Sequence, residues 1–320
     1  MKIDVLALDG VFDTGLATLL DTFSTANELA EMLGLAALRF DVRIIGLRRT
    51  VRTAHGLTVP VVSDSHTVRP DWVIVPALDS KMPDQLVVTL ERPDVRDAVQ
   101  ALRRWASEGT HIGAACIGTF ILAESCLLDH QTATTAWWLA PLFRRRYPRV
   151  RLDESRMVVA CGPFVTTGAA LSHIDLALWL VRRLSPELAA QTARYLVVDS
   201  RPTHSTYVIT DHLTHSDPLV TKFERWSRER LALGFSLDDA ALALATNKRT
   251  LSRRIGEALG KSPLAYFQDL RVERAVHLLR TSNDSVDAVA AAVGYAEGVT
   301  LRTLLRRRLG RGVREIRQSA

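Results

Sequence analysis

Thr250-Leu-Ser-Arg-Arg-Ile-Gly-Glu-Ala-Leu259 recurs fifty residues later as Thr300-Leu-Arg-Thr-Leu-Leu-Arg-Arg-Arg-Leu309, and a glycine follows each copy. In both copies an apolar residue returns at every fourth position, which predicts a helix with one buried face. A short helix that opens with a serine cap is expected before each copy, over residues 236–245 and 285–294. The C-terminal part of the chain is therefore predicted to contain the same two-helix unit twice.

Each unit has the pattern of a helix-turn-helix, whose second helix can enter the major groove of DNA. A long helix from 264 to about 280, started by Ser262 and Pro263, is expected to connect the two units. If it holds them about one turn of DNA apart, roughly 34 Å, both second helices can read one face of the duplex. The outward faces of the second helices are basic, with Arg249, Arg253 and Arg254 in the first copy and Arg302, Arg306, Arg307 and Arg308 in the second.

The positive charge of the chain is concentrated in this module. Residues 235–320 hold 15 Lys and Arg against 9 Asp and Glu, a net charge of +6, whereas the remainder of the chain is balanced. A solvated helical bundle would not explain an excess confined to one module, but phosphate binding does. Arg307 and Arg308 are expected to hold phosphates, which position a protein without specifying sequence. Residues that read bases are expected at Lys248, Arg249, Thr250, Ser252 and Arg253 of the first unit and at Thr300, Arg302, Thr303 and Arg306 of the second.

Three segments of this module relate it to a known family: Gly260-Lys-Ser-Pro-Leu-Ala-Tyr-Phe267, Arg271-Val-Glu-Arg-Ala275 and Ala292-Val-Gly-Tyr295. Together with the spacing of the repeat, they closely resemble the AraC/XylS family of transcription regulators. The resemblance implies promoter DNA and RNA polymerase as partners, and it favours activation of transcription. That family usually ends in Thr-Pro and an aromatic residue, where this chain has Gly312-Val313 and later Ile316, so the last turn is expected to differ.

Strand and helix signals alternate through residues 3–197. Short apolar strands are expected at 3–8, 40–47, 72–75, 112–115, 157–160 and 164–167, and helices at 15–32, 94–108, 119–127, 137–146, 170–184 and 186–197. This alternation predicts an α/β domain, a parallel-sheet sandwich with helices on both faces, whose ligands bind at the carboxyl ends of the strands. We therefore expect a sensor domain over 1–198, a linker over 199–234 and an all-α tandem helix-turn-helix domain over 235–320.

One strand of this domain leads directly into a candidate site. The apolar run 112–115 ends at Cys116, Gly118 follows, and a helix is expected to begin there. In such a strand-to-helix elbow the nearby helix N-terminus lowers the pKa of a thiol and favours thiolate. The residues alone are more typical of a buried Cys that packs as a small hydrophobe, and a reactive role stays open as the alternative.

The segments Ala115-Cys-Ile-Gly118, Leu122-Ala-Glu124 and Ala133-Thr-Thr135 resemble the PfpI/ThiJ family, whose fold is related to class I glutamine amidotransferases. The chain as a whole resembles the GlxA-like regulators, which join such a domain to an AraC-type module. In enzymes of the PfpI/ThiJ family the elbow Cys works with a His just after the Thr-Thr pair and with a carboxylate near the first strand. This chain has Ala136 in place of that His, and it offers Asp13 near the first strand.

Nucleophilic catalysis normally needs the missing base, although His111 or His173 could substitute for it in space. We therefore expect a pocket that senses a small-molecule effector, with no catalytic residues and no cofactor, in preference to an enzyme active site. The expected pocket residues are Asp13, Cys116, Ile117, Trp137 and Trp138. For one of the two tryptophans, core packing is at least as good an account. The main rival is a cysteine hydrolase or glyoxalase-like enzyme tethered to DNA; an architectural DNA protein would leave the α/β domain without a role.

The region between the domains raises two further questions. The spacing of His204, His212 and His215 fits a shared metal, but no other ligand lies nearby, so a polar linker is the better interpretation and no metal is expected. Arg225, Arg228 and Arg230 surround Trp226 and predict a helix that leads into the DNA-binding module. That helix either packs against the module or transmits changes from the pocket.

The remaining features concern the cellular setting. Three Cys without close spacing predict neither a disulfide framework nor a zinc motif. No secretory signal pattern is visible, and the longest uncharged run, 157–174, contains Gly, Pro and His, which makes it a poor membrane span. We therefore expect a cytoplasmic protein, and a homodimer joined through the first domain so that two modules sit on repeated half-sites.

Overall fold

A computed structural model describes residues 1–35, 37–63, 69–198 and 217–318 of the chain. Contacts within the chain divide it into two compact units, Met1–His204 and Ser205–Ala320. Each unit has its own buried apolar cluster, as two independently packed domains require. Among the described residues, no helix is both long and apolar enough to cross a membrane.

The N-terminal unit is built on a seven-stranded sheet. Its strands are ordered β10 (Val158–Cys161), β11 (Phe164–Thr167), β7 (His111–Ala115), β6 (Trp72–Val75), β1 (Lys2–Leu6), β2 (Asp41–Gly46) and β5 (Val62–Ser63). All neighbours pair in parallel except β10 and β11, which are antiparallel. The central strands β1, β6 and β7 are buried beyond their first residues, because helices cover both faces of a parallel sheet. The predicted α/β class is confirmed.

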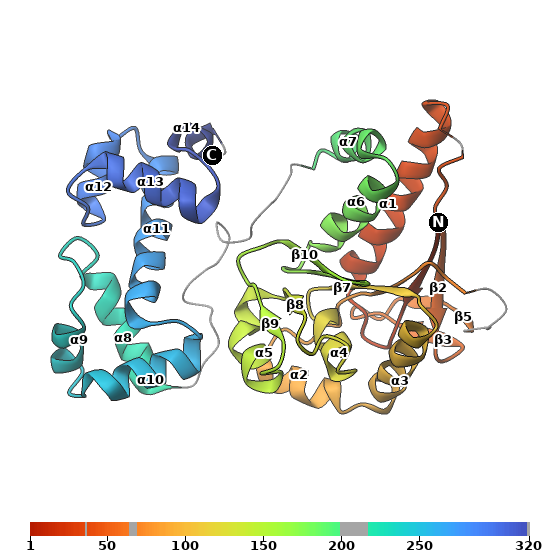
Figure 1. Ribbon diagram of the computed structural model, residues 1–320, viewed down its shortest axis with the longest axis horizontal. Helices are drawn as coiled ribbons and strands as arrows, with labels where there is room; N and C mark the ends of the chain where they lie inside the picture. The colour runs from red at the N-terminus through yellow and green to blue at the C-terminus, as the bar shows by residue number, and fades with distance from the viewer. Residues whose placement is uncertain (36, 64–68, 199–216, 319–320) are drawn as a thin grey trace. The chain divides into compact units, whose positions relative to one another are not determined.

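Helices lie on both faces of this sheet (Figure 1). One face carries α1 (Asp13–Met32), α6 (His173–Leu184) and α7 (Pro186–Tyr195), which pack on one another. The other carries α2 (Pro83–Leu90), α3 (Pro93–Ser107) and α4 (Gly118–Glu124). The helix predicted over 137–146 is divided into a short 3-10 helix, Trp137–Leu139, followed by α5 (Ala140–Arg146), where Pro141 starts the α-helical turn. Two small ribbons complete the unit: β3 (Thr50–Arg52) with β4 (Thr58–Pro60), and β8 (Thr132–Ala133) with β9 (Arg151–Leu152).

The described part of the C-terminal unit is helical. Its helices are α8 (Pro218–Glu229), α9 (Leu237–Ala243), α10 (Lys248–Leu259), α11 (Pro263–Thr281), α12 (Val286–Ala292), α13 (Gly298–Leu309) and α14 (Val313–Gln318). The predicted serine caps form: Ser236, Ser262 and Ser285 each accept a hydrogen bond from the backbone N–H three residues on. After the second helix of each unit, Gly260 and Gly310 adopt positive φ of 66° and 67°, which terminates the helix. Both two-helix units of the predicted tandem helix-turn-helix are therefore present, although the first helix of each is shorter than expected.

Helix α8 packs inside the C-terminal unit. Its Phe223 is fully buried, 5.8 Å from the ring of Tyr266 on α11, and Phe235 packs 5.1 Å from Phe267. This aromatic cluster explains why the helix around Trp226 packs against the module, one of the two alternatives left open by the sequence. The chain was expected to be a linker until residue 234, whereas helical structure packed on the module begins at Pro218.

Candidate nucleic-acid interface and cysteine elbow

The predicted elbow is present between β7 and α4. Cys116 has a positive φ of 55°, a strained value for a residue with a side chain, and its N–H donates to the Thr167 carbonyl oxygen at 2.7 Å. Gly118 is needed because a Cβ there would collide with the carbonyl oxygen of Val75. Close approach of the helix to strand β6 therefore fixes the sharp turn.

The environment of the elbow thiol opposes ionisation. Cys116 and Ile117 are each only 2% exposed, and burial raises the pKa of the Cys116 thiol to about 12. The Thr135 hydroxyl donates to the Cys116 carbonyl oxygen at 2.8 Å, and Ala136, where related enzymes carry His, is fully buried. Burial outweighs the hydrogen bond from the Ile117 N–H at the helix start, which lowers that pKa, so the thiol is protonated at neutral pH and the lowered pKa that the sequence indicated is wrong.

His173 does not replace the missing base. Its ring is fully buried; Nδ1 lies 3.0 Å from the Ala170 carbonyl oxygen, and Nε2 accepts the Ala77 N–H at 3.1 Å. Because Nε2 is an acceptor, Nδ1 must carry the proton, which defines a neutral ring. Burial lowers the pKa of His173 to about 4. Both ring nitrogens are thus committed to backbone atoms.

His111 lies at the opposite end of strand β7 from Cys116. The five residues of the strand separate them by roughly 16 Å. Its ring stacks on Trp72 with centroids 4.8 Å apart, which is a packing role. Neither histidine considered as a substitute base is placed to take the thiol proton.

Asp13 lies at the start of α1, beyond the carboxyl end of β1, and has a partner that the sequence did not reveal. Its Oδ2 accepts hydrogen bonds from the His55 ring at 2.8 Å and from the His55 N–H at 3.1 Å. Burial would raise the pKa of Asp13, but hydrogen bonds from Thr53 and His55 outweigh it and lower that pKa. His55 comes from the loop between β3 and β4, so only the folded chain brings it to Asp13.

The two tryptophans are placed differently. Trp137 is 8% exposed and meets Trp138 edge to face with centroids 5.4 Å apart. Trp138 is half-buried, and its Nε1–H donates to the Lys81 carbonyl oxygen at 3.1 Å. The Lys81 ammonium lies 5.8 Å from the ring of Phe12, which precedes Asp13. This chain of contacts connects Trp138 with the start of α1, at the carboxyl edge of the sheet.

In the first helix-turn-helix, part of the basic face of α10 is neutralised by neighbouring acids. Lys248 pairs with Asp238 of α9 at 2.9 Å, and Arg253 pairs with both carboxylate oxygens of Glu257 at 2.9 Å. Both basic side chains are more than half exposed. The other predicted reading residues of this helix are the exposed Arg249 and the half-buried Thr250 and Ser252.

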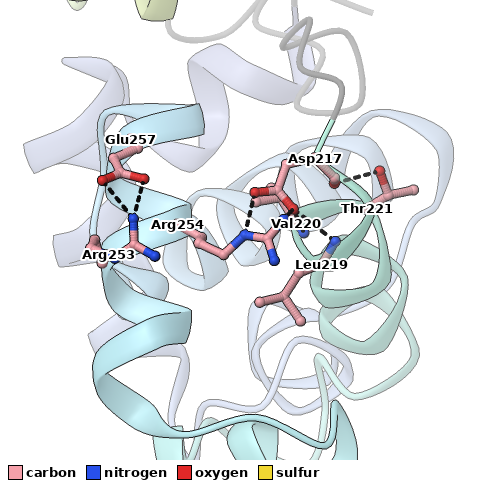
Figure 2. Close-up of polar contacts among 7 residues, drawn as sticks. All are labelled: Asp217, Leu219, Val220, Thr221, Arg253, Arg254 and Glu257. Carbon is pink, nitrogen blue, oxygen red and sulfur yellow. Dashed lines mark hydrogen bonds and ion pairs between the residues drawn. The ribbon is translucent and has the colours of Figure 1, made fainter.

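Arg254 of the same helix points back into the module instead of outward as expected. Its guanidinium donates two hydrogen bonds to the Asp217 carboxylate (Figure 2), from Nε at 2.6 Å and from Nη2 at 2.5 Å. Asp217 also caps α8 by accepting the Leu219 and Val220 N–H groups. Burial raises the pKa of Asp217, but the Arg254 guanidinium and these N–H groups outweigh it and lower that pKa. One carboxylate thus joins α10 to α8. We call α10 and α13, the helices that carry the predicted base-reading residues, the reading helices.

In the second helix-turn-helix, α13 contains no acidic residue. The predicted reading residues Thr300, Arg302, Thr303 and Arg306 are all exposed, and so is Arg307. Arg308 was expected to hold a phosphate, but it donates to Asp269 at 3.0 Å and to Gln268 at 3.1 Å. Asp269 also pairs with Lys261, which follows α10, so this carboxylate on α11 anchors the ends of both reading helices.

Three histidines between the domains fit a metal site by their spacing, although a polar linker is the better interpretation. His204, His212 and His215 lie outside the described residues. Within the described ranges, no group of three or more His, Cys, Asp or Glu is arranged to hold a metal ion.

Comparison with known proteins finds matches to the helix-turn-helix module and matches that extend into the N-terminal domain. Residues 240–319 match the family described as a helix-turn-helix domain. GbdR, an HTH-type transcriptional regulator of Pseudomonas aeruginosa, is 25% identical over 212 residues, or 65% of this chain and 58% of GbdR. This chain therefore spans less than two thirds of the length of that relative. Because 212 residues exceed the helix-turn-helix region, the likeness extends into the N-terminal domain.

Two solved structures show the fold. An AraC family transcriptional regulator from Pseudomonas putida has a TM-score of 0.51 and 20% identity, over 61% of this chain and 98% of its own. A ThiJ/PfpI family protein from Pseudomonas syringae has a TM-score of 0.50 and 14% identity, over 83% of this chain and 90% of its own. The resemblances drawn from the elbow and from the repeated module are confirmed.

Proposed function

We propose that this chain, whose C-terminal module belongs to the AraC-type helix-turn-helix regulators, binds promoter DNA at specific sequences and regulates transcription in response to a small molecule. The observation that carries the proposal is the pair of helices α10 and α13 in one helical module, each of which exposes basic side chains. Helix α13 contains no acidic residue and exposes Arg302 and Arg306, and α10 presents Arg249 beside half-buried polar side chains. Such a face attracts phosphates and offers donors to base edges.

The direct test is selection of DNA from a random-sequence library by the 320-residue chain. A sequence reader enriches a motif with two elements whose centres lie about 10 base pairs apart, one for each reading helix. A chain that binds phosphates without reading bases enriches no motif, and that result would overturn the proposal. Arg96→Ala, which removes an exposed arginine of α3, is the matched control and should leave the motif unchanged.

The N-terminal domain serves as the sensor in this proposal. Its proposed pocket residues are Asp13, Cys116, Ile117, Trp137 and Trp138. The proposal is supported by Asp13 at the start of α1 and Cys116 directly after β7, since α/β folds bind ligands at the carboxyl ends of their strands. Because Cys116 and Ile117 are almost fully buried, an effector would meet Asp13 and Trp138 first. Asp13→Asn should abolish an effector's shift of DNA affinity without changing the affinity of the free protein.

The remaining partners follow from this role. We place the protein in the cytoplasm with chromosomal DNA, as a homodimer that engages repeated half-sites and contacts RNA polymerase at an activated promoter. Light scattering tests the dimer, because a monomer at the concentration of DNA binding would exclude it. The tethered-enzyme alternative is disfavoured, because Cys116 has a raised pKa and both His111 and His173 are engaged elsewhere.

A further inference from the structure

The two reading helices present different chemistry at equivalent positions. Their buried residues superpose in register, Leu251 with Leu301 and Ile255 with Leu305, fifty residues apart. In the same register Val299 of α13 stands where α10 has Arg249, and Thr303 stands where it has Arg253. One outward pair is therefore cationic and the other is small and apolar.

Val299 is an exposed apolar side chain on a face otherwise made of polar residues. It is 62% exposed on the first turn of α13, and Thr303 follows one helical turn later on the same face. The Thr303 hydroxyl donates to the Val299 carbonyl oxygen at 3.1 Å. That bond commits the hydroxyl to the backbone and leaves the methyl group as the part of Thr303 available to a partner.

The residues around this pair identify the partner. Arg302 and Arg306 are exposed beside Val299 and Thr303, and no acid occurs on the helix. Glu297 and Asp287 lie at the first residue of the helix, but the exposed charges that follow Val299 along α13 are all basic. The surface therefore complements an apolar group set in an anionic surface. The major groove of DNA offers such a group, the 5-methyl group of thymine.

We propose, on the basis of the DNA-reading role above, that Val299 and the Thr303 methyl group form an apolar contact that selects thymine in the major groove. The equivalent contact in the first unit differs, because Arg249 is suited to the paired acceptors of guanine. The two elements of the binding site are therefore unlike in sequence: the element read by α13 contains a required thymine, and the element read by α10 contains a guanine.

The test uses the site selected by the 320-residue chain and replaces each thymine in turn with deoxyuridine. That change removes one methyl group and leaves base pairing intact. At one thymine in the α13 element, the replacement should weaken binding about fourfold, the factor expected for exposing one buried methyl group. Fluorescence anisotropy at a single salt concentration measures it.

Protein variants then assign the contact. With Val299→Ala or Thr303→Ser, the fourfold penalty at that thymine should shrink towards one, since the methyl group has lost its partner. Thr303→Ser keeps the hydroxyl bond to the backbone, so it tests the methyl group alone. Leu242→Ala is the matched control: Leu242 is 83% exposed on α9, outside the reading face, and its loss should leave the penalty unchanged.

The outcomes separate this inference from the role on which it rests. A deoxyuridine penalty that vanishes in both variants, with unchanged thermal unfolding, supports it. Selection of a specific site whose deoxyuridine penalties are the same in wild type, Val299→Ala and Thr303→Ser would overturn it while leaving the regulator intact. Failure to select any site would overturn both.

Discussion

The candidate functional side chains of the cysteine elbow are buried, whereas the arginines of the reading helix α13 are exposed. At the elbow, Cys116 and His173 are buried, and both nitrogens of His173 are held by backbone atoms. On α13, Arg302 and Arg306 are exposed on a helix that has no acid. A side chain that acts on a partner needs unused bonding capacity, which the exposed arginines of α13 have and the buried His173 lacks.

The difference shows what a shared fold preserves. The elbow keeps the positive φ of Cys116 and the close approach at Gly118, which are properties of the backbone. The chemistry that would use the elbow requires a base, and Ala136 occupies that position. The elbow therefore keeps the backbone geometry of the related fold without the base that its chemistry would use.

The largest effect expected from this contrast is in thiol reactivity. At pH 7.5 iodoacetamide should label Cys116 about a thousandfold more slowly than the exposed Cys126, because a pKa near 12 leaves little thiolate. Mass spectrometry of peptides from one sample measures both rates, so Cys126 serves as an internal control. Labelling of Cys116 as fast as Cys126 would restore the elbow as a reactive site.

His173→Ala should destabilise the N-terminal domain by about 3 kcal/mol, because it opens a cavity and leaves the Ala77 N–H without an acceptor. Hydrogen exchange of α1 and α6 peptides measures the loss. DNA affinity should not change at temperatures where the variant remains folded.

The pH dependence of stability gives the same residue a second test. The folded pKa of His173, about 4, lies below its ordinary value of 6.5, so the unfolded chain binds the proton first. Stability present above pH 6.5 should fall by up to about 3 kcal/mol as the pH drops towards 4. A His173→Ala variant with the same pH slope in this range would contradict the assignment.

For an exposed side chain of α13 we expect the opposite of the His173 result: DNA affinity should change and stability should not. Arg306→Ala should weaken specific DNA binding by about 1–3 kcal/mol and leave thermal unfolding unchanged, since its side chain is exposed. Arg308→Ala removes the same charge from the same helix but breaks the bond to Asp269, so it should lower stability instead. Equal effects of the two changes on DNA affinity would mean that charge alone decides binding.

Asp217 lies in the helix-turn-helix module, but its carboxylate is already bonded to Arg254 and to the start of α8. Asp217→Ala removes both the cap of α8 and the Arg254 pair, and should cost about 1–2 kcal/mol. Asp217→Asn retains a capping side chain and should cost less. Because the folded pKa of Asp217 is lowered, the contribution of the ion pair is present above the unfolded pKa and lost as the pH falls below about 4. Exchange rates of α8 peptides that rise equally in both variants would assign the whole effect to the pair.

The smallest expected effect concerns Arg253, a predicted reading residue that is paired with Glu257. Glu257→Gln should release Arg253 and tighten DNA binding by about 0.3 kcal/mol, the size of an exposed pair one turn apart. Fluorescence anisotropy at low salt is the suitable measurement, because salt screens the pair. Weaker binding in this variant would indicate that Glu257 orients Arg253 towards its base.

Local features of the fold were predictable from the sequence, and long-range pairings were not. The serine caps at Ser236 and Ser285 and the glycine ends of both reading helices depend on residues within one turn, so spacing revealed them. The pairing of Arg254 with Asp217 joins residues 37 positions apart. No local pattern distinguishes an arginine that faces solvent from one that reaches another helix.

The same limit applied to the elbow. The strand, the Cys and the helix are consecutive in the sequence, so the turn could be predicted. The thiol pKa depends on burial by the whole domain, and the helix N-terminus alone gave the wrong direction. His55 was missed as the partner of Asp13 because it lies 42 residues away in a loop.

One measurement tests the central claim, that the open reading face recognises sequence. It is the affinity of the 320-residue chain for its selected site and for a scrambled site of equal length and composition, at one salt concentration. If the arginines of α10 and α13 read bases, the chain binds the selected site at least about a thousandfold more tightly than the scrambled site. Equal affinity for the two sites would show that the arginines of α10 and α13 bind phosphates only, and would contradict the claim.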